Sequence, residues 1–115
     1  MKLPGFERAV IEPAKLRDYL LSREHPVGRF KAAFFGTLGY SLEGWRRLEA
    51  DLRTLIASHD AMPGEPSEHG PKYQVRGTLK APTGATAEIV SIWIILTGED
   101  FPRFVTAYPG AGHEI

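Results

Sequence analysis

The sequence predicts an α+β domain in which three N-terminal helices pack on a C-terminal antiparallel sheet of three or four strands. Apolar residues in the first half recur every three or four positions, as on one face of a helix, whereas those after residue 71 alternate with polar residues, as in a strand. At 115 residues the chain has the length of one domain. We therefore expect a single domain with a helical half at residues 1–57, a mobile loop at 58–70 and the antiparallel sheet at 71–108.

The first predicted helix starts at Pro13, because proline fits the first turn of a helix, where its missing N–H costs nothing. Leu16, Tyr19 and Leu20 form its apolar side. The apolar residues 9–11 before it are either a fourth, short edge strand or an apolar lead-in.

The second predicted helix follows His25-Pro26, since a residue before proline is pushed out of the α region. Its apolar side chains recur at four-residue spacing, with Phe35 beside them, and predict one buried aromatic face: Phe30, Phe34, Phe35 and Leu38. Gly39 stands where a helix commonly ends in a left-handed cap, with Tyr40 as the apolar contact.

The third predicted helix begins at Ser41, which is a favourable N-cap residue. Its apolar residues follow helical spacing: Trp45, Leu48, Leu52, Leu55 and Ile56. We expect Trp45, Phe34 and the later Trp93 to share one apolar layer between the helices and the sheet.

The sheet is predicted from three segments. Residues 72–80 alternate between apolar and basic or polar side chains. Residues 89–96 are apolar on both faces apart from Ser91, which predicts a central strand covered on both sides. The last strand runs over residues 103–108 and is predicted to carry Phe104, Thr106 and Tyr108 on one face.

Composition excludes several classes of protein. Fourteen Lys and Arg balance fourteen Asp and Glu, which argues against a general nucleic-acid binder, and there is no cysteine for a disulfide or a thiolate zinc site. The first ten residues lack the apolar core of a signal peptide, and no run of about eighteen apolar residues exists. We expect a soluble cytoplasmic protein without membrane contact.

Metal-ligating residue types gather in the loop at residues 58–70, namely His59, Asp60, Glu65, Glu68 and His69. A mobile polar loop also collects such residues for solubility. We therefore expect neither a metal nor a cofactor, and leave open whether this loop binds a partner.

One set of residue types suits metal-independent RNA cleavage. That reaction takes a proton from a 2′-hydroxyl, stabilises a dianionic phosphorane with fixed cations and returns a proton to the leaving oxygen. The candidate catalytic residues are His25, Lys31, Arg103, Thr106 and Tyr108. The candidate phosphate- or RNA-binding residues are Arg29, Lys72 and Arg76. The N-terminal end of the second helix adds backbone N–H groups that favour an anion.

The alternative interpretation of these residues is structural. Lys31 then lays its stem over neighbouring phenylalanines, His25 caps the break between helices, and Arg76 keeps an exposed face of the sheet hydrated.

Several motifs resemble an uncharacterised family of small bacterial domains of unknown function. They cover nearly the whole chain: LP at 3–4, AVIEPAKLRDYLL from Ala9, HPVGRFKAAFFGTLGY from His25, KYQVRGTL from Lys72, IWI at 92–94 and PRFVTAYP from Pro102. More distantly, the order of helices and then an antiparallel sheet resembles the small metal-independent ribonuclease toxins of the barnase, colicin and RelE type. That second resemblance implies a toxin-like fold with catalytic His, Lys, Arg, Thr or Tyr side chains.

Two hypotheses of function remain. One is a toxin-like, metal-independent ribonuclease or RNA-directed domain. The other is a non-catalytic protein-interaction module, a regulatory, antitoxin or immunity-type partner that uses the polar sheet face or the loop at residues 58–70. The partner is therefore RNA in the first hypothesis and another protein in the second.

Overall fold

The computed structural model of the chain describes residues 1–110. Two single turns, the 3₁₀ turn η1 (Phe6–Arg8) and the first turn α1 (Pro13–Lys15), precede the π-helical turn η2 (Leu16–Leu20). The longer helices are α2 (Gly28–Thr37) and α3 (Trp45–Ser58). The strands are β1 (Ala61–Pro63), β2 (Lys72–Lys80), β3 (Thr86–Ile94) and β4 (Arg103–Pro109).

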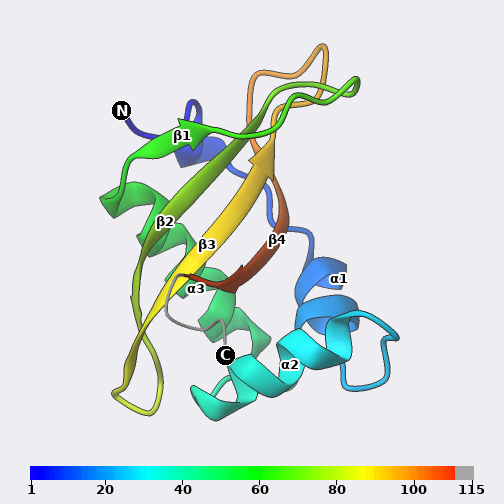
Figure 1. The fold of residues 1–115 in the computed structure, drawn as a ribbon, viewed down its shortest axis with the longest axis vertical. Helices are drawn as coiled ribbons and strands as arrows, with labels where there is room; N and C mark the ends of the chain where they lie inside the picture. The colour runs from blue at the N-terminus through cyan, green and yellow to red at the C-terminus, as the bar shows by residue number, and fades with distance from the viewer. Residues whose placement is uncertain (111–115) are drawn as a thin grey trace.

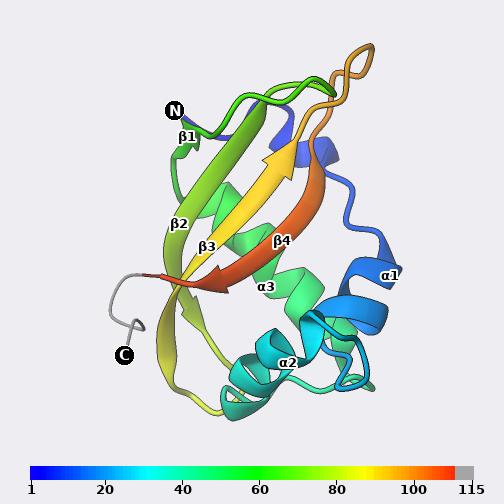
Figure 2. The ribbon, with the colours of Figure 1, turned by 45° about the vertical axis from the view of Figure 1, so that its right-hand side comes forward.

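The four strands form one antiparallel sheet in the order β1-β2-β3-β4. Helix α3 lies behind this sheet in the view of Figure 1, and α1 and α2 lie beside its β4 edge and lower end. Figure 2 shows the same arrangement from the side, with β4 passing in front of the other strands. The α+β prediction of helices packed on a C-terminal antiparallel sheet is confirmed.

The core lies between α3 and the inner face of the sheet. Trp93 of β3 is completely buried there, and Phe34 and Trp45 pack against the same cluster while staying partly exposed. Ser91 is the buried polar residue of this layer. Its hydroxyl donates to the Val75 carbonyl oxygen at 3.0 Å and accepts from Nε1–H of Trp93 at 2.9 Å, so a polar group is buried with its hydrogen bonds made.

Helix α2 buries most of the predicted aromatic face but not Phe30. Phe30 is 68% exposed, whereas Ala32 and Phe35 are buried together with Gly28. The reason is close packing at the start of the helix: a Cβ atom on Gly28 would overlap the backbone carbonyl of Tyr19. Small residues at 28 and 32 let α2 approach η2, and that orientation turns Phe30 outward.

The sequence predicts the C-terminal end of α2 correctly but not the start of α3. The predicted left-handed cap is confirmed, because Gly39 has φ of 97° and the N–H of Tyr40 donates to the carbonyl of Phe35 at 3.1 Å. The prediction that Ser41 is the N-cap of α3 is wrong, because α3 begins at Trp45 after Gly44. The Ser41 hydroxyl instead accepts from the N–H of Gly44 at 3.1 Å, in the turn before the helix.

The fourth strand comes from residues 58–70. Ala61–Pro63 pair with Tyr73–Val75 of β2, so this segment is not structureless, and its mobility stays a prediction. Residues 9–11 contribute a single parallel bridge, in which Val10 exchanges two backbone hydrogen bonds of 2.9 Å with Pro102 and Phe104.

The outer face of the sheet, here called the open face, has no helix over it in the described chain (Figure 1). Three residues of it form a cross-strand row: Gln74 of β2, Ile92 of β3 and Thr106 of β4. The prediction that β3 is covered on both sides is confirmed only at residues 89–91, where Val90 of the open face is also buried, and it is wrong at Ile92 and Ile94, which stay partly exposed.

A β-bulge decides which side chains of β4 reach the open face. Trp93 pairs with Phe104, but Ile92 pairs with Thr106, so Val105 is an extra residue. Phe104 consequently points into the core, while Thr106 and Tyr108 share the open face. The prediction that all three share one face is wrong for this reason.

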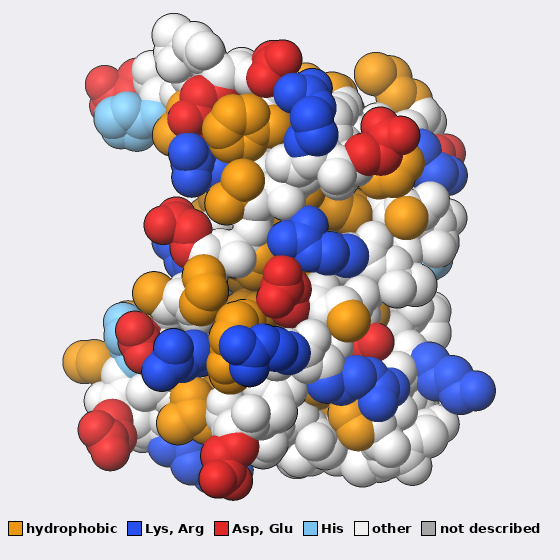
Figure 3. Space-filling model, turned by 180° about the vertical axis from the view of Figure 1, so that it is seen from behind, with side chains coloured by type: hydrophobic (Ala, Val, Ile, Leu, Met, Phe, Trp, Pro, Cys, Tyr) orange, Lys and Arg blue, Asp and Glu red, His pale blue; other side chains and the backbone are white. Residues whose placement is uncertain are grey.

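The opposite surface, over α3, mixes charges of both signs (Figure 3). Arg47 pairs with Asp51 at 2.9 Å and Arg53 with Glu49 at 3.0 Å along this helix. Such pairs leave no uniform basic surface there.

Within residues 1–110 no helix is both long and apolar enough to cross a membrane.

Candidate functional site

Lys31 lies at the centre of a small polar cluster beside β4. Its ammonium donates to the Tyr19 hydroxyl at 3.0 Å and to the Thr106 hydroxyl at 2.8 Å. The Nζ atom also lies 5.2 Å from the ring centroid of Tyr19 and 5.9 Å from that of Tyr108. Three parts of the chain that are distant in sequence thus meet around one cation, within the distance at which one phosphate could touch several of them.

Local backbone features position each member of this cluster. Tyr19 stands on the π-helical turn η2, in which the N–H of Leu21 bonds to the carbonyl of Leu16 at 2.8 Å. Such turns occur frequently at functional sites. Gly28 allows α2 to approach this turn, and the bulge at Val105 aims Thr106 toward Lys31. The cluster depends on these three irregular features together.

The charge of Lys31 is not neutralised by a carboxylate among residues 1–110, where its polar partners are hydroxyl groups and aromatic rings. The side chain is only partly exposed. An ammonium has three N–H donors, and two are engaged by Tyr19 and Thr106. One donor therefore remains for a ligand, and a partly desolvated cation without a counter-ion favours an anion.

Tyr19 has a perturbed acidity. The hydrogen bond from Lys31 lowers the pKa of the Tyr19 hydroxyl below its usual value of 10.0, and partial burial opposes this effect. A hydrogen bond with Thr106 and the charge of Lys31 act in the same direction as the first cause. Lys31 thus makes this phenol easier to deprotonate, which is the property that a proton acceptor needs.

His25 caps helix α2 through its ring. Nδ1 accepts hydrogen bonds from the N–H groups of Val27 at 3.0 Å and Gly28 at 2.9 Å, and the neutral imidazole therefore carries its proton on Nε2. The ring also packs edge-on against Tyr19 with 4.9 Å between centroids. Since these backbone N–H groups are engaged by His25, the expected anion site at the start of α2 is not available.

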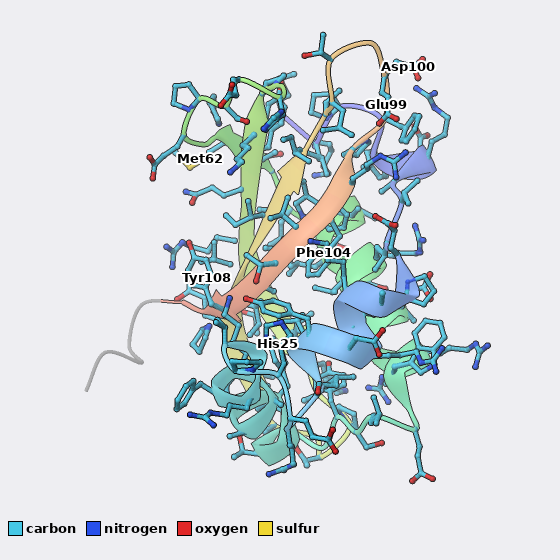
Figure 4. All side chains as sticks on the ribbon, turned by 90° about the vertical axis from the view of Figure 1, so that its right-hand side faces the viewer. His25, Met62, Glu99, Asp100, Phe104 and Tyr108 are labelled. Carbon is cyan, nitrogen blue, oxygen red and sulfur yellow. The ribbon has the colours of Figure 1, made fainter. Side chains whose placement is uncertain are left out.

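Figure 4 shows His25 and Tyr108 at the same end of the sheet, whereas Glu99 lies at the opposite end of β4. Arg103 belongs to that opposite end. Its guanidinium is held by Glu99 at 2.9 Å and lies 4.0 Å from Glu12, so the structure does not bring it to Lys31. Of the five candidate catalytic residues, Lys31, Thr106 and Tyr108 converge, His25 adjoins them through Tyr19, and Arg103 stands apart.

The candidate phosphate-binding residues are dispersed. Arg29 is exposed and lies 4.9 Å from the ring of Phe30. Arg76 is paired with Glu88 at 3.5 Å. Lys72 lines a cavity on the open face that also reaches Thr106 and Tyr108, so it is the member of this set that borders the cluster.

Sequence reasoning missed Tyr19 as a site residue. Its spacing places it on the apolar side of the first helix, together with Leu16 and Leu20, which are both completely buried. The signal that could have found it is chemical: a tyrosine on a buried face needs a partner for its hydroxyl. A nearby lysine on an aromatic helix is a natural candidate.

The metal-ligating residue types of the loop serve other contacts. Asp60 pairs with the N-terminal ammonium at 3.0 Å, and Nδ1 of His59 lies 3.0 Å from the carbonyl oxygen of Leu55. In the part of the chain that the structure describes, no three His, Asp or Glu side chains are grouped to hold a metal ion.

The chain belongs to a family described as a domain of unknown function (DUF6883), which matches residues 2–111. None of the curated proteins matches the sequence. Among solved structures, a chain of a contact-dependent growth inhibition toxin–immunity protein complex from Klebsiella pneumoniae 342 has a similar fold, with a TM-score of 0.66. The match covers 88% of this chain and 99% of that one at 16% identity, so the likeness is one of fold.

Proposed function

We propose that this protein is a toxin-like ribonuclease that cleaves RNA without a metal ion, at the cluster formed by Tyr19, Lys31, Thr106 and Tyr108. The observation that carries the proposal is the Lys31 ammonium, which is held by two hydroxyl groups and by no carboxylate among the described residues. A fixed cation with a remaining donor is what a developing phosphorane dianion requires. The fold shared with a chain of a toxin–immunity complex fits a toxin and an immunity protein equally.

The proposed reaction is an attack of the 2′-hydroxyl oxygen on the adjacent phosphorus. Tyr19 accepts the 2′-hydroxyl proton in its phenolate form, which the hydrogen bond from Lys31 favours. Lys31 stabilises the phosphorane through its third N–H. Tyr108, which is 37% exposed, donates a proton to the departing 5′-oxygen. The products are a 2′,3′-cyclic phosphate and a 5′-hydroxyl, and solvent restores both tyrosines.

Thr106 and His25 act as positioning residues in this scheme. Thr106 fixes the ammonium from the side of the sheet at 2.8 Å. His25 is unsuited to accept a proton at Nδ1, because that atom already accepts two backbone hydrogen bonds, and it instead holds α2 and packs on Tyr19.

The test is incubation of the purified protein with total RNA in the presence of a chelator, followed by analysis of fragment ends. We expect cleavage with cyclic-phosphate ends, and Lys31→Ala should reduce the rate about 10²–10³-fold, the usual cost of removing one transition-state donor. Lys80→Ala is the matched control, since Lys80 is an exposed lysine outside the cluster. Absence of cleavage by the wild-type protein, or equal rates for Lys31→Ala, would contradict the proposal.

A second candidate function is the non-catalytic interaction module. It is favoured by the open face of the sheet, where partly exposed Ile92 and Ile94 lie near Met62, which is 60% exposed. Expression in a bacterial host separates the two functions. A ribonuclease should arrest growth in a way that depends on Lys31, whereas an interaction module should leave growth unchanged.

A further inference from the structure

The open face of the sheet holds a cavity of about 430 Å³ that adjoins the Lys31 cluster. Thr106 and Tyr108 belong to both, and Thr106 is the residue that binds Lys31 at 2.8 Å. The volume falls within the range of about 300–1,000 Å³ that is typical of small-ligand sites. A group covalently attached to a phosphate at Lys31 would therefore reach this cavity directly.

The lining of the cavity combines two apolar side chains with several polar and charged ones. Ile92 and Val105 provide the apolar part from β3 and β4. Gln74, in register with Ile92, contributes an amide. Glu65, from the segment between β1 and β2, contributes a carboxylate, and Lys72 contributes an ammonium.

We infer that this cavity binds a nucleobase that carries an exocyclic amino group, on the RNA strand whose phosphate lies at Lys31; this inference rests on the proposed function. An aromatic base has apolar faces and a polar edge, and the cavity offers apolar side chains for the first and polar groups for the second. Single-stranded RNA is commonly read in this way, by contact with base faces and hydrogen bonds to base edges.

The carboxylate of Glu65 limits which chemical groups the cavity can bind. Its carboxylate repels a second phosphate, which argues for a base and against another backbone group at this position. Ionised carboxylates only accept hydrogen bonds, so Glu65 pairs with amino N–H groups such as those of cytosine or adenine. Uracil offers a single ring N–H between two carbonyls and lacks the amino group. Lys72 and Gln74 supply donors for the remaining acceptors of the base edge.

The test measures binding of short single-stranded RNAs that cannot be cleaved because every 2′-hydroxyl is methylated. Fluorescence anisotropy with the full chain compares oligocytidine, oligoadenosine and oligouridine strands of equal length. We expect the cytidine and adenosine strands to bind about tenfold more tightly than the uridine strand, the usual effect of one well-made base contact. Glu65→Ala should abolish this difference.

Glu68→Ala is the matched control, because Glu68 is an exposed glutamate of the same segment that does not line the cavity. It should retain the preference. Equal binding of all three strands, or a preference that survives Glu65→Ala, would overturn the inference. The proposed function is judged separately, by cleavage of the corresponding unmethylated strands. Base preference without cleavage would refute the ribonuclease and leave the base site. Cleavage without base preference would refute the base site and leave the ribonuclease.

Discussion

A positively charged side chain lies at each end of β4, but the surroundings of the two charges differ. Arg103 at the start of the strand is held by Glu99 at 2.9 Å and approached by Glu12. Lys31, beside the far end of the strand, is held by the hydroxyl groups of Tyr19 and Thr106. Figure 4 shows how far apart these ends lie, with Glu99 at one and Tyr108 at the other.

This difference separates a structural cation from a candidate functional one. A guanidinium that is already neutralised has little to gain from binding an anion. An ammonium with hydroxyl partners keeps its charge available, and those partners fix its position without cancelling it. Both residues look alike in the sequence, where each is a basic residue next to an aromatic one. Their partners, and not their residue types, decide which of them can bind phosphate.

The sharpest test of the comparison removes each charge in turn with a side chain of similar length. Lys31→Met should reduce RNA cleavage about 10²–10³-fold while changing the free energy of unfolding by less than about 0.5 kcal/mol. Arg103→Met should do the opposite, lowering the melting temperature and leaving cleavage unchanged, because it removes the partner of Glu99. Thermal melts and initial cleavage rates of the two variants measure both effects. If both variants lost activity equally, the distinction between the two ends would be wrong.

The next prediction concerns the packing that brings Lys31 to Tyr19. Gly28→Ala places a methyl group against the Tyr19 carbonyl and ring, so α2 must move away from η2. Overpacking of this kind costs about 1–3 kcal/mol. Separation from Lys31 should also return the pKa of Tyr19 toward its usual value, since the Lys31 hydrogen bond is the main cause of its lowering.

Denaturant unfolding and ultraviolet titration of the tyrosines measure these two effects. Gly36→Ala is a suitable control, because a Cβ atom at this glycine of the same helix would meet only the end of the Arg23 side chain, at 3.1 Å. A Gly28→Ala protein with unchanged stability and an unchanged tyrosine titration would show that α2 does not need this close contact.

The sequence was sufficient for the parts of the fold that follow local rules. Alternation over residues 72–80 matches β2, and Gly39 takes the left-handed conformation that its position after a helix predicts. The sequence was insufficient where packing between elements decides which side of an element is buried. Phe30 has helical spacing with Phe34, but the small residue at 28 rotates α2 so that Phe30 faces outward.

The candidate site could be predicted from the sequence even less well than the fold. Lys31 and Thr106 are 75 residues apart, and only the pairing register of the sheet and the bulge at Val105 bring them together. One inserted residue moves the side chains of all later residues in a strand to the opposite face of the sheet. No periodicity in residues 103–108 reveals this insertion. The residue types of the cluster were therefore predictable in part, whereas its membership, with Tyr19 included and Arg103 left out, was not.

The smallest expected effect is a pH dependence confined to the Arg103 end of β4. The hydrogen bond from Arg103 holds the pKa of Glu99 below its usual value of 4.5 in the folded protein. The unfolded chain therefore takes up a proton at Glu99 at higher pH than the folded protein does. The stability that this pair contributes is present above the unfolded pKa and is lost as the pH falls through the folded one.

Glu99→Gln removes this contribution, so its melting temperature should lie below that of the wild-type protein at neutral pH, and the gap should close as the pH falls below about 4. Glu43→Gln, at an exposed position, should show no such gap. Lys31→Met provides the contrast, because no described carboxylate is bonded to that ammonium, and any difference from wild type should stay constant over the same acidic range. A constant gap for Glu99→Gln, or a closing one for Lys31→Met, would mean that the two ends of β4 do not differ in the way their partners indicate.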